Sequence, residues 1–350
     1  WLPSMFRHRL APVDDVVGDI IAEHGPLADY AIYLAHLDGV WRAAPAPVGS
    51  PNFASVSRLD LFQKHAGVDL QKIFPADKNR DPMLVDSWDY ELFLTAAEKL
   101  HAAGNPFGAP ISGAVNDSNQ WLGAVFAAYG ASIINEAGEI SVDSDEVRAV
   151  LDYLVRLTQF MPDSIYAWDD AGNNRWLISG RGSGVCNPPS AWAVANRDKP
   201  EVAKELWHHD NPRGPKGRFR TGNPTFWGIW DFSENIPAAK DLLRYVAKRD
   251  VVGRLVSASQ GYDIPVITSH YRSNDYWTKA EPPRGVLYNY PVRGDEKQIV
   301  AGYPAPPEFA SQIYAQLLLP NLVARVTQGG DSIEDAIAWA ANEAELVSRG

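Results

Sequence analysis

The residues from Ser164 to Trp192, SIYAWDDAGNNRWLISGRGSGVCNPPSAW, constrain the fold of this chain more than any other segment. Their order predicts a helix, a break at glycines, a short buried strand and a polar loop stiffened by proline. Residues 176–178, WLI, give the helix an apolar side, and residues 184–186, GVC, suit a buried strand. Such a strand delivers Asn187 and Trp192 to the carboxyl edge of an α/β sheet, where open sheets bind ligands.

The size and charge of the chain exclude several classes of protein. With 350 residues it is long enough for two domains or lobes, each with an ample core. The formal net charge is −11 and no Lys/Arg-rich run stands out, which argues against a nucleic-acid partner. No stretch reaches the ~18 uninterrupted apolar residues that a membrane helix needs.

The chemistry-bearing residue types do not form a known catalytic or metal motif. Cys186 is the single cysteine, which excludes an intramolecular disulfide framework and a zinc ribbon. The segment His208-His209-Asp210 is predicted to be a solvated loop, because adjacent histidines point in different directions on a regular element. The glycine-rich segment 180–184, GRGSG, matches neither a phosphate loop nor a nucleophile elbow. We therefore expect no cofactor and no metal.

The aromatic content is high, with 12 Trp, 14 Tyr and 12 Phe. Most of these rings are expected in cores and lobe packing. A few are expected to line a cleft and to stack on the apolar faces of a ligand.

Several short tracts occur in an order that resembles one protein family. These are residues 10–15 (LAPVDD), 38–45 (DGVWRAAP), 184–192 (GVCNPPSAW), 222–229 (GNPTFWGI) and the helix start at 331–334 (DSIE). The chain resembles the family 1 extracellular solute-binding proteins of ABC importers, the maltose-binding-protein-like group. The resemblance implies an α/β, two-lobed periplasmic-binding-protein type 2 fold, with an interlobe ligand cleft and hinge crossings.

The resemblance also implies how the chain is divided. Lobe one is expected to comprise residues 1–52 and 223–272, and lobe two residues 53–222 and 273–350. In family members the LAPVDD-like tract lies well inside the chain, whereas here it begins at residue 10. We therefore expect this sequence to lack the N-terminal βαβ portion of lobe one.

Local patterns predict individual elements. Asp38-Gly39 predicts a hairpin, and Ser87 is a predicted N-cap for the helix that follows. Residues 110–115 are expected to be a buried strand, followed by a helix through Tyr129 that Gly130 ends. Residues 143–146 are expected to cap a helix with an apolar stripe, and Asp331 and Glu334 to form a capping box for the last helix.

The candidate ligand-binding residues lie at strand ends, helix starts and the expected crossings between lobes. They are Asn52, Phe53, Asn116, Asp117, Gln120, Trp121, Trp168, Asp169, Asn187, Ser190, Trp192, Asn223, Phe226, Trp227, Tyr262, Tyr303 and Phe309. The alternative for each polar residue is helix capping, and for each aromatic residue lobe packing. In sugar-binding family members a Trp of the loop after the strand stacks on the sugar. Here Ser190 falls at that position and Trp192 lies two residues later.

The resemblance implies reversible capture of a sugar, small oligosaccharide or polyol, followed by delivery to an ABC permease in the membrane. It further implies a monomer that is periplasmic or extracellular, either free or lipid-anchored, and that is not an enzyme. Two alternatives stay open. One is a carbohydrate-active enzyme that uses paired carboxylates, and the other is a ligand-sensing or interaction protein without a transport role.

Overall fold

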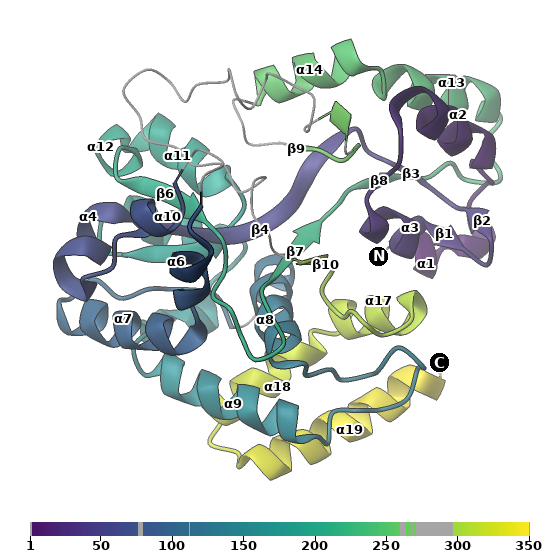
Figure 1. Cartoon of the computed structure of the whole chain (residues 1–350). Helices are drawn as coiled ribbons and strands as arrows, with labels where there is room; N and C mark the ends of the chain where they lie inside the picture. Colours follow the sequence, from purple (N-terminus) through teal and green to yellow (C-terminus); the bar gives the residue numbers. More distant parts are fainter. Residues whose placement is uncertain are drawn as a thin grey trace. The chain divides into compact units, whose positions relative to one another are not determined.

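The computed structural model describes residues 2–75, 80–111, 113–259, 264–267, 269–270 and 297–349. The chain forms two compact units, and each draws on two separate stretches of sequence. Unit 1 comprises Trp1–Pro51 and Gly222–Glu281, and unit 2 comprises Asn52–Thr221 and Pro282–Gly350. Both units combine helices with short sheets, so the expected α/β class is confirmed (Figure 1).

Unit 1 contains short strands and a small set of helices. Its elements are α1 (Leu2–Met5), η1 (Arg7–Arg9), α2 (Asp14–His24), α3 (Asp29–Ala35), β1 (His36–Leu37), β2 (Val40–Trp41), β3 (Ala44–Pro45), β8 (Phe226–Trp227), α13 (Ile236–Val246), α14 (Arg249–Ala258) and β9 (Ile264–Pro265). The predicted hairpin is confirmed, because β1 and β2 pair antiparallel around Asp38 and Gly39. Both turn residues have positive φ, 53° and 75°, as a two-residue hairpin turn requires.

The sheet of unit 2 is built around one long strand, β4 (Val48–Arg58), whose first residues also pair with β9. Strands β5 (Gly184–Asn187) and β6 (Leu206–His209) pair antiparallel with its second half (Figure 1). Ser55 lies opposite both Cys186 and His209, so β4 is flanked on both sides. Strands β7 (Phe219–Asn223) and β10 (Lys297–Ile299) pair parallel and extend the sheet.

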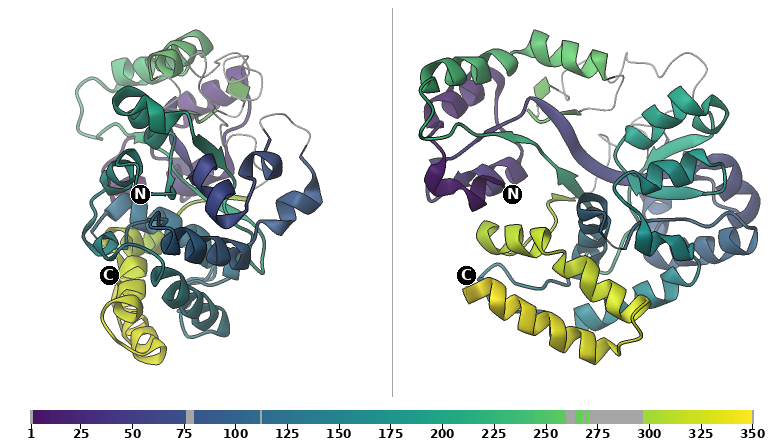
Figure 2. Two further views of the ribbon diagram at one scale, coloured as in Figure 1. Left: turned by 90° about the vertical axis from the view of Figure 1, so that its left-hand side faces the viewer. Right: turned by 180° about the vertical axis from the view of Figure 1, so that it is seen from behind.

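Helices enclose this sheet. They are α4 (Leu59–Leu61), η2 (Phe62–Ala66), α5 (Leu70–Ile73), α6 (Pro82–Ser87), α7 (Tyr90–Ala102), α8 (Val115–Tyr129), α9 (Asp145–Thr158), η3 (Asp163–Ala167), α10 (Gly172–Ile178), α11 (Ser190–Asp198), α12 (Pro200–Ala203), α17 (Pro307–Ala315), α18 (Leu318–Thr327) and α19 (Ile333–Arg349). Helices α9, α18 and α19 pack against one another at one end of the unit, which the turned views of Figure 2 also show. Within the described ranges, no helix is both long and apolar enough to span a membrane.

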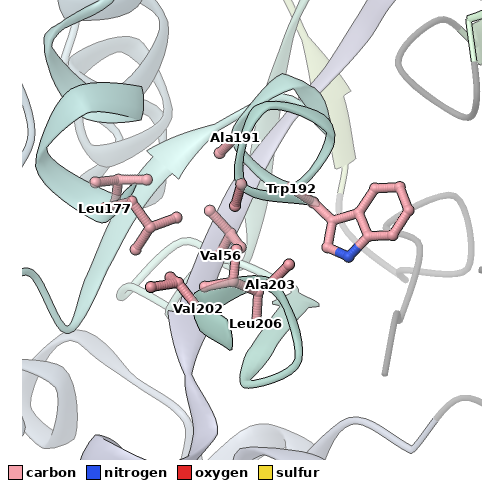
Figure 3. Close-up of a cluster of buried hydrophobic side chains, with 9 residues drawn as sticks. Val56, Leu177, Ala191, Trp192, Val202, Ala203 and Leu206 are labelled. Carbon is pink, nitrogen blue, oxygen red and sulfur yellow. The ribbon is translucent and has the colours of Figure 1, made fainter. Parts of the chain in front are cut away.

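A buried apolar cluster holds α10 and α11 against the sheet (Figure 3). Val56 of β4, Leu177 of α10 and Ala191 of α11 are completely buried in it. Figure 3 shows Trp192 at the edge of this cluster, where its side chain is 2% exposed. The ends of β5 and α10 are therefore fixed by packing, which matters for the polar groups they present.

Several local expectations are confirmed and others are wrong by a small displacement. Helix α8 ends at Gly130 with φ of 80°, and Ser144 caps α9 by accepting from the Val147 amide. Helix α7 is capped by Asp89, whose carboxylate accepts from the Leu92 amide at 2.8 Å, instead of by Ser87. At α19 the capping pair is one residue later than predicted, because the Ser332 hydroxyl accepts from the Asp335 amide at 3.1 Å.

Three expectations around the central sheet are wrong. Residues 110–115 form no strand in their described part, since Pro110 has no amide hydrogen and Ile111 donates to the Ile165 carbonyl. The loop expected after Asn187 is short, because α11 already begins at Ser190. The order of the segment from Ser164 to Trp192 predicted that residues 169 and 170 lie early in its helix, but they precede α10.

The segment His208-Asp210 is not a solvated loop. Both histidines lie on β6 and are at most 1% exposed, and Asp210 is fully buried beside them. The Asp210 carboxylate pairs with the Arg80 guanidinium at 2.9 Å, and His209 Nε2 lies 2.9 Å from the Ser57 hydroxyl. We call Ser57, Arg80, His209 and Asp210 the β6 cluster. Its polar side chains bond within the core, where an exposed loop had been expected.

Candidate functional site

A group of polar side chains, some buried and some reaching the surface, gathers where the start of α8, the start of α10 and the end of β5 meet. We call it the Asn173 cluster after its central member. It consists of Asn116, Asp117, Gln120, Asp170, Asn173, Asn174, Asn187, Ser190 and Tyr314, all of which belong to unit 2.

Asn173 joins three elements of the cluster. Its Nδ2 lies 2.6 Å from Oδ2 of Asp117 on α8 and 2.5 Å from Oδ1 of Asn187 on β5. Its Oδ1 accepts from the amide of Asn174 at 2.9 Å. The side chain is fully buried, so its amide fixes the orientation of both partners.

Asn187 carries the network from the strand end into α11. Its Nδ2 donates to Oδ1 of Asn174 at 2.7 Å and to Oγ of Ser190 at 2.9 Å. Asn187 is 2% exposed and Asn174 is half-buried. Residues that the sequence placed at the strand end, Asn187 and Ser190, are therefore brought together with residues of α8.

The start of α8 is capped from outside its own sequence. Ala114, its N-cap residue, has no side chain that could accept a hydrogen bond. Instead Oδ1 of Asp170 accepts from the amides of Asn116 and Asp117 at 3.2 and 3.1 Å. A carboxylate at this position satisfies free amide groups and also complements the helix dipole.

Asp117 lies in an environment that disfavours its charge. Its side chain is 4% exposed. Burial and, to a lesser degree, the negative charge of Asp170 raise the pKa of Asp117 to about 7, although the hydrogen bond from Asn173 opposes the shift. Near neutral pH this carboxyl group therefore exchanges a proton.

Tyr314 of α17 closes one side of the cluster. Its hydroxyl donates to Oδ1 of Asn116 at 2.6 Å, across 198 sequence positions. Burial raises the pKa of Tyr314 above its ordinary value, and the charges of Asp170 and Asp117 add to this effect. A hydrogen bond from Gln120 to the same tyrosine places Gln120 in the cluster.

Two acceptors of the cluster have no donor in the described part of the structure. Gln120 is 1% exposed and its Oε1 has no hydrogen-bond partner. Asp117 uses Oδ2 for Asn173, while no hydrogen bond to its Oδ1 is found. The two residues are three positions apart on α8 and so face the same side of the helix. A ligand that fits here must bring donors, such as hydroxyl or ammonium groups.

Two tryptophans support the start of α10 from behind. Trp168 is 9% exposed, its indole N–H donates to the Ser164 hydroxyl at 3.1 Å, and its ring lies 5.9 Å from that of Trp176. A Cβ atom at Gly172 would lie 2.5 Å from Cβ of Trp168, and one at Gly182 would lie 2.5 Å from Cδ1 of Trp176. The glycines of this segment therefore allow the rings to pack closely.

Other predicted site residues of unit 2 make structural contacts. Phe53 is 1% exposed, and Trp121 donates its indole N–H to the Pro110 carbonyl at 2.6 Å. Trp192 belongs to the apolar cluster of Figure 3. Asp169 is exposed and pairs with Arg175 at 2.5 Å. These contacts agree with the packing and capping alternatives, and a ligand contact by these residues stays a prediction.

The remaining candidates lie outside the Asn173 cluster. Phe226 and Trp227 form β8 of unit 1, where Trp227 is 39% exposed. Tyr303 is 37% exposed with Lys297 Nζ 5.4 Å from its ring centre, and Phe309 packs on Gly138. Tyr262 lies outside the described residues, as do the side chains of Asn52 and Asn223.

Four cluster members were missed as contacts by sequence reasoning: Asp170, Asn173, Asn174 and Tyr314. The Asn173-Asn174 pair is a detectable signal, because two asparagines in a seven-residue helix are costly unless their side chains are bonded. Tyr314 has no such signal, since its partner is remote in the sequence.

Unit 1 carries a different concave feature, a groove of about 630 Å³ between α2 and α13. Its central cation, Arg244, already pairs with Asp19 at 2.7 Å and with Asp15 at 2.9 Å. The central cation of this open groove is therefore already paired with acidic side chains of the protein. No group of three potential metal ligands occurs in the described ranges of either unit.

Solved structures with the same fold are sugar-binding and polyol-binding proteins. Maltose-bound MalE3 of T. maritima superposes with a TM-score of 0.73 and 20% identity, covering 99% of this chain and 82% of that one. A sugar transporter protein from Arthrobacter chlorophenolicus A6 with bound laminaribiose gives 0.72 and 16%, over 97% and 81%. An ABC transporter solute-binding protein from Agrobacterium vitis S4 with bound D-mannitol gives 0.66 and 19%, over 97% and 80%.

This chain has the fold of the two-lobed periplasmic binding proteins. The fold expected from the motif order is thereby confirmed. No family model matches the sequence, and no curated protein matches it. The similar structures are binding proteins, not enzymes. At identities of 20% or less they establish the fold, and the function has to be argued from the site.

Proposed function

We propose that this protein is the solute-binding component of an ABC importer and that it captures a small polyhydroxyl solute at the Asn173 cluster. The observation on which this rests is the pair of donor-free acceptors, Asp117 Oδ1 and Gln120 Oε1, on the same side of α8. Solved proteins of the same fold hold maltose, laminaribiose and D-mannitol, which are all polyhydroxyl compounds.

The chemistry of the cluster suits hydroxyl groups. Asparagine and glutamine amides both donate and accept, and carboxylates accept from hydroxyl donors. The exposed Asp170 and the half-buried Asn116, Asn174 and Tyr314 are the members that a solute reaches first. The buried members, Asn173 and Asn187, hold them in place through short hydrogen bonds. Such preorganisation favours affinity because little ordering is left for the binding step.

The test is a thermal-shift screen of the purified protein against sugars, polyols, amino acids and organic acids. A sugar or polyol that binds the native state raises the melting temperature in proportion to the logarithm of its concentration. Asn187→Ala should lower the affinity for that ligand by about tenfold or more, because the substitution leaves the buried polar partners of Asn187 unpaired. Asn321→Ala, which alters an exposed amide on α18, should leave the affinity unchanged. Failure of every sugar and polyol to bind the folded protein would overturn the proposal.

The enzyme alternative makes a different prediction. Asp117 and Asp170 are two carboxylates at one site, as a glycosidase requires. We propose that they bind and do not hydrolyse, since Asp170 is engaged by two backbone amides and Asp117 Oδ2 by Asn173. Incubation of the protein with the solute found in the screen should return that solute intact, as judged by NMR.

The remaining parts of the proposal follow from the transport role. The protein acts outside the cytoplasmic membrane, in the periplasm or extracellularly, as a monomer that docks on a membrane permease. Size-exclusion chromatography with light scattering tests the monomer, and uptake of the identified solute by cells lacking the gene tests the transport role.

A further inference from the structure

The Asn173 cluster contains negative charge without a compensating cation. Asp170 accepts two backbone amides at 3.2 and 3.1 Å, and Asp117 accepts from Asn173 at 2.6 Å. No ion pair joins either carboxylate to a Lys, Arg or His in the described parts of the chain. Among the described residues, the charge that acts on Asp117 is that of Asp170, and it is repulsive.

The elements that contribute side chains to the cluster supply no cation that pairs with Asp117 in the described residues. The segment before α10 brings Asp169 and Asp170. Helix α10 brings Arg175, but its guanidinium lies 2.5 Å from the Asp169 carboxylate, and Asp169 takes up that charge. Helix α17 brings the Tyr314 hydroxyl, which donates to Asn116. Strand β5 brings the Asn187 amide and the Cys186 carbonyl, both bonded to Asn173.

One buried acceptor of the cluster has no donor in the described part of the structure. Gln120 Oε1 is unpaired and the residue is 1% exposed. Gln120 is tied to the cluster through Tyr314, and it lies one helical turn beyond Asp117 on α8. Leaving such an acceptor without a donor is costly unless a bound molecule supplies one. The unfilled acceptors and the uncompensated carboxylates therefore lie on the same part of α8.

We propose that the solute carries a protonated amine beside its hydroxyl groups, as an amino sugar or an aminocyclitol does. The ammonium group lies against Asp117 and Asp170, and a hydroxyl donor reaches Gln120. This inference rests on the proposed function, since it specifies the chemical class of the solute captured at the same site.

An ammonium group matches what the cluster lacks. It is a donor with three hydrogens and no acceptor, so it suits a site rich in acceptors. Its positive charge favours the ionised form of a neighbouring carboxyl group. Burial raises the pKa of Asp117 to about 7 in the free protein. An ammonium ligand would lower it, and binding would then release the proton of Asp117. A neutral polyol brings no such charge.

The experiment compares three probes that share one ring: glucosamine, N-acetylglucosamine and glucose. Dissociation constants are measured by isothermal titration calorimetry at pH 6.5 on the full chain. We expect glucosamine to bind at least tenfold more tightly than the other two, because acetylation removes its charge. Asp117→Asn should reduce the affinity for glucosamine to that for glucose. The control variant is Asp152→Asn. Asp152 is an exposed acid on α9 outside the Asn173 cluster, so its replacement should leave all three dissociation constants unchanged.

The pH dependence gives a second readout. Between pH 5.5 and 7.0 Asp117 is mostly protonated in the free protein, so displacement of its proton makes glucosamine bind more tightly as the pH rises. The affinity should increase by up to about tenfold per pH unit, the limit for release of one proton. The Asp117→Asn variant should show no such rise. Titrations in two buffers of different ionisation enthalpy count the released protons directly.

The outcomes separate this inference from the proposed function. If glucose and N-acetylglucosamine bind as tightly as glucosamine, or if Asp117→Asn leaves the preference intact, the amine inference is wrong and the proposed function stands. If none of the probes and no other sugar or polyol binds the folded protein, both are wrong. Preferential binding of glucosamine that depends on Asp117 and on pH supports both.

Discussion

Unit 2 contains two buried polar clusters, and they differ in how their charge is balanced. In the β6 cluster the fully buried Asp210 pairs with Arg80 at 2.9 Å. That guanidinium also lies 5.5 Å from the centre of the Phe74 ring. In the Asn173 cluster the charge that acts on buried Asp117 is that of another carboxylate, Asp170. One cluster contains its own counter-charge, and in the described residues the other does not.

His209 Nδ1 lies 2.9 Å from the Asp210 carbonyl, so it carries the hydrogen, and Nε2 accepts from the Ser57 hydroxyl. This arrangement ties β6 to β4. Both clusters contain a buried acceptor without a donor in the described part of the structure, Asp210 Oδ1 in one and Gln120 Oε1 in the other. An unpaired acceptor alone therefore does not distinguish the two clusters. The difference lies in the charge, because Asp210 has an arginine partner and Asp117 has none among the described residues.

The largest expected effect comes from breaking the ion pair of the β6 cluster. Asp210→Ala leaves the Arg80 guanidinium, 8% exposed, without its counter-charge, and we expect a loss of about 3–5 kcal/mol in the free energy of unfolding. Chemical denaturation measures it. Asp231→Ala removes an exposed partner of Arg9 and should cost at most about 1 kcal/mol. Equal costs for the two variants would contradict the structural role of the β6 cluster.

The second prediction concerns the loss of stability at low pH that the two buried histidines of β6 cause. Burial lowers the pKa of His208 to about 3 and that of His209 to about 4, from an ordinary value of 6.5. Each histidine stays neutral in the folded protein and gains a proton on unfolding, so stability falls as the pH drops below 6.5. The loss should reach a few kcal/mol by pH 4, at ~1.4 kcal/mol per pKa unit. Ring nitrogen spectra that show either histidine protonated at pH 5.5 in the folded state would refute this.

The third prediction is that ionisation of Asp117 lowers the stability of the protein as the pH rises, whereas the histidines lower it as the pH falls. The pKa of Asp117 is raised from 3.8 to about 7, so its ionisation destabilises the fold as the pH rises between these values. Asp117→Asn, which mimics the protonated form, should gain up to about 4 kcal/mol relative to the wild type above pH 7. Near pH 4 the two proteins should be equally stable. Denaturation at several pH values measures this, and a pH-independent difference would count against it.

The smallest expected effect tests whether the close packing of Trp168 on Gly172 supports the Asn173 cluster. Gly172→Ala places a methyl group 2.5 Å from Cβ of Trp168, and we expect it to cost about 1–3 kcal/mol. It should also weaken solute binding, since α10 carries Asn173 and Asn174. Gly18→Ala in α2 meets no atom within 4 Å and should instead stabilise by about 0.5–1 kcal/mol. A stabilising effect at Gly172 would show that Trp168 moves freely aside.

Sequence reasoning succeeded where a short pattern determines a local structure. The Asp38-Gly39 turn, the glycine that ends α8 and the Ser144 cap of α9 each depend on neighbouring residues alone. It failed where tertiary contacts decide. His209 appears polar along the sequence, yet it is buried against Phe74 and Trp88, whose rings lie 5.5 Å from its own.

The candidate site, like the fold, could be predicted only in part from the sequence. Asn116, Asp117, Gln120, Asn187 and Ser190 were selected because they follow a strand or begin a helix, and the structure gathers them. Asp170 was not selected as a contact, because its role is to cap a helix that begins over fifty positions earlier, and this is visible only in three dimensions. Tyr314 lies still further along the chain.

The way the two units share the sequence also sets an order of assembly during synthesis. Strands β4, β5 and β6 of unit 2 are complete once residue 209 has left the ribosome. The strand pair of unit 1, β3 with β8, needs Phe226 and Trp227, and its pairing of β4 with β9 needs Ile264. The unit that begins first is therefore completed after the central strands of the other. A nascent chain whose first 215 residues have left the ribosome would contain every member of the Asn173 cluster except Tyr314, while unit 1 would still lack β8 and β9.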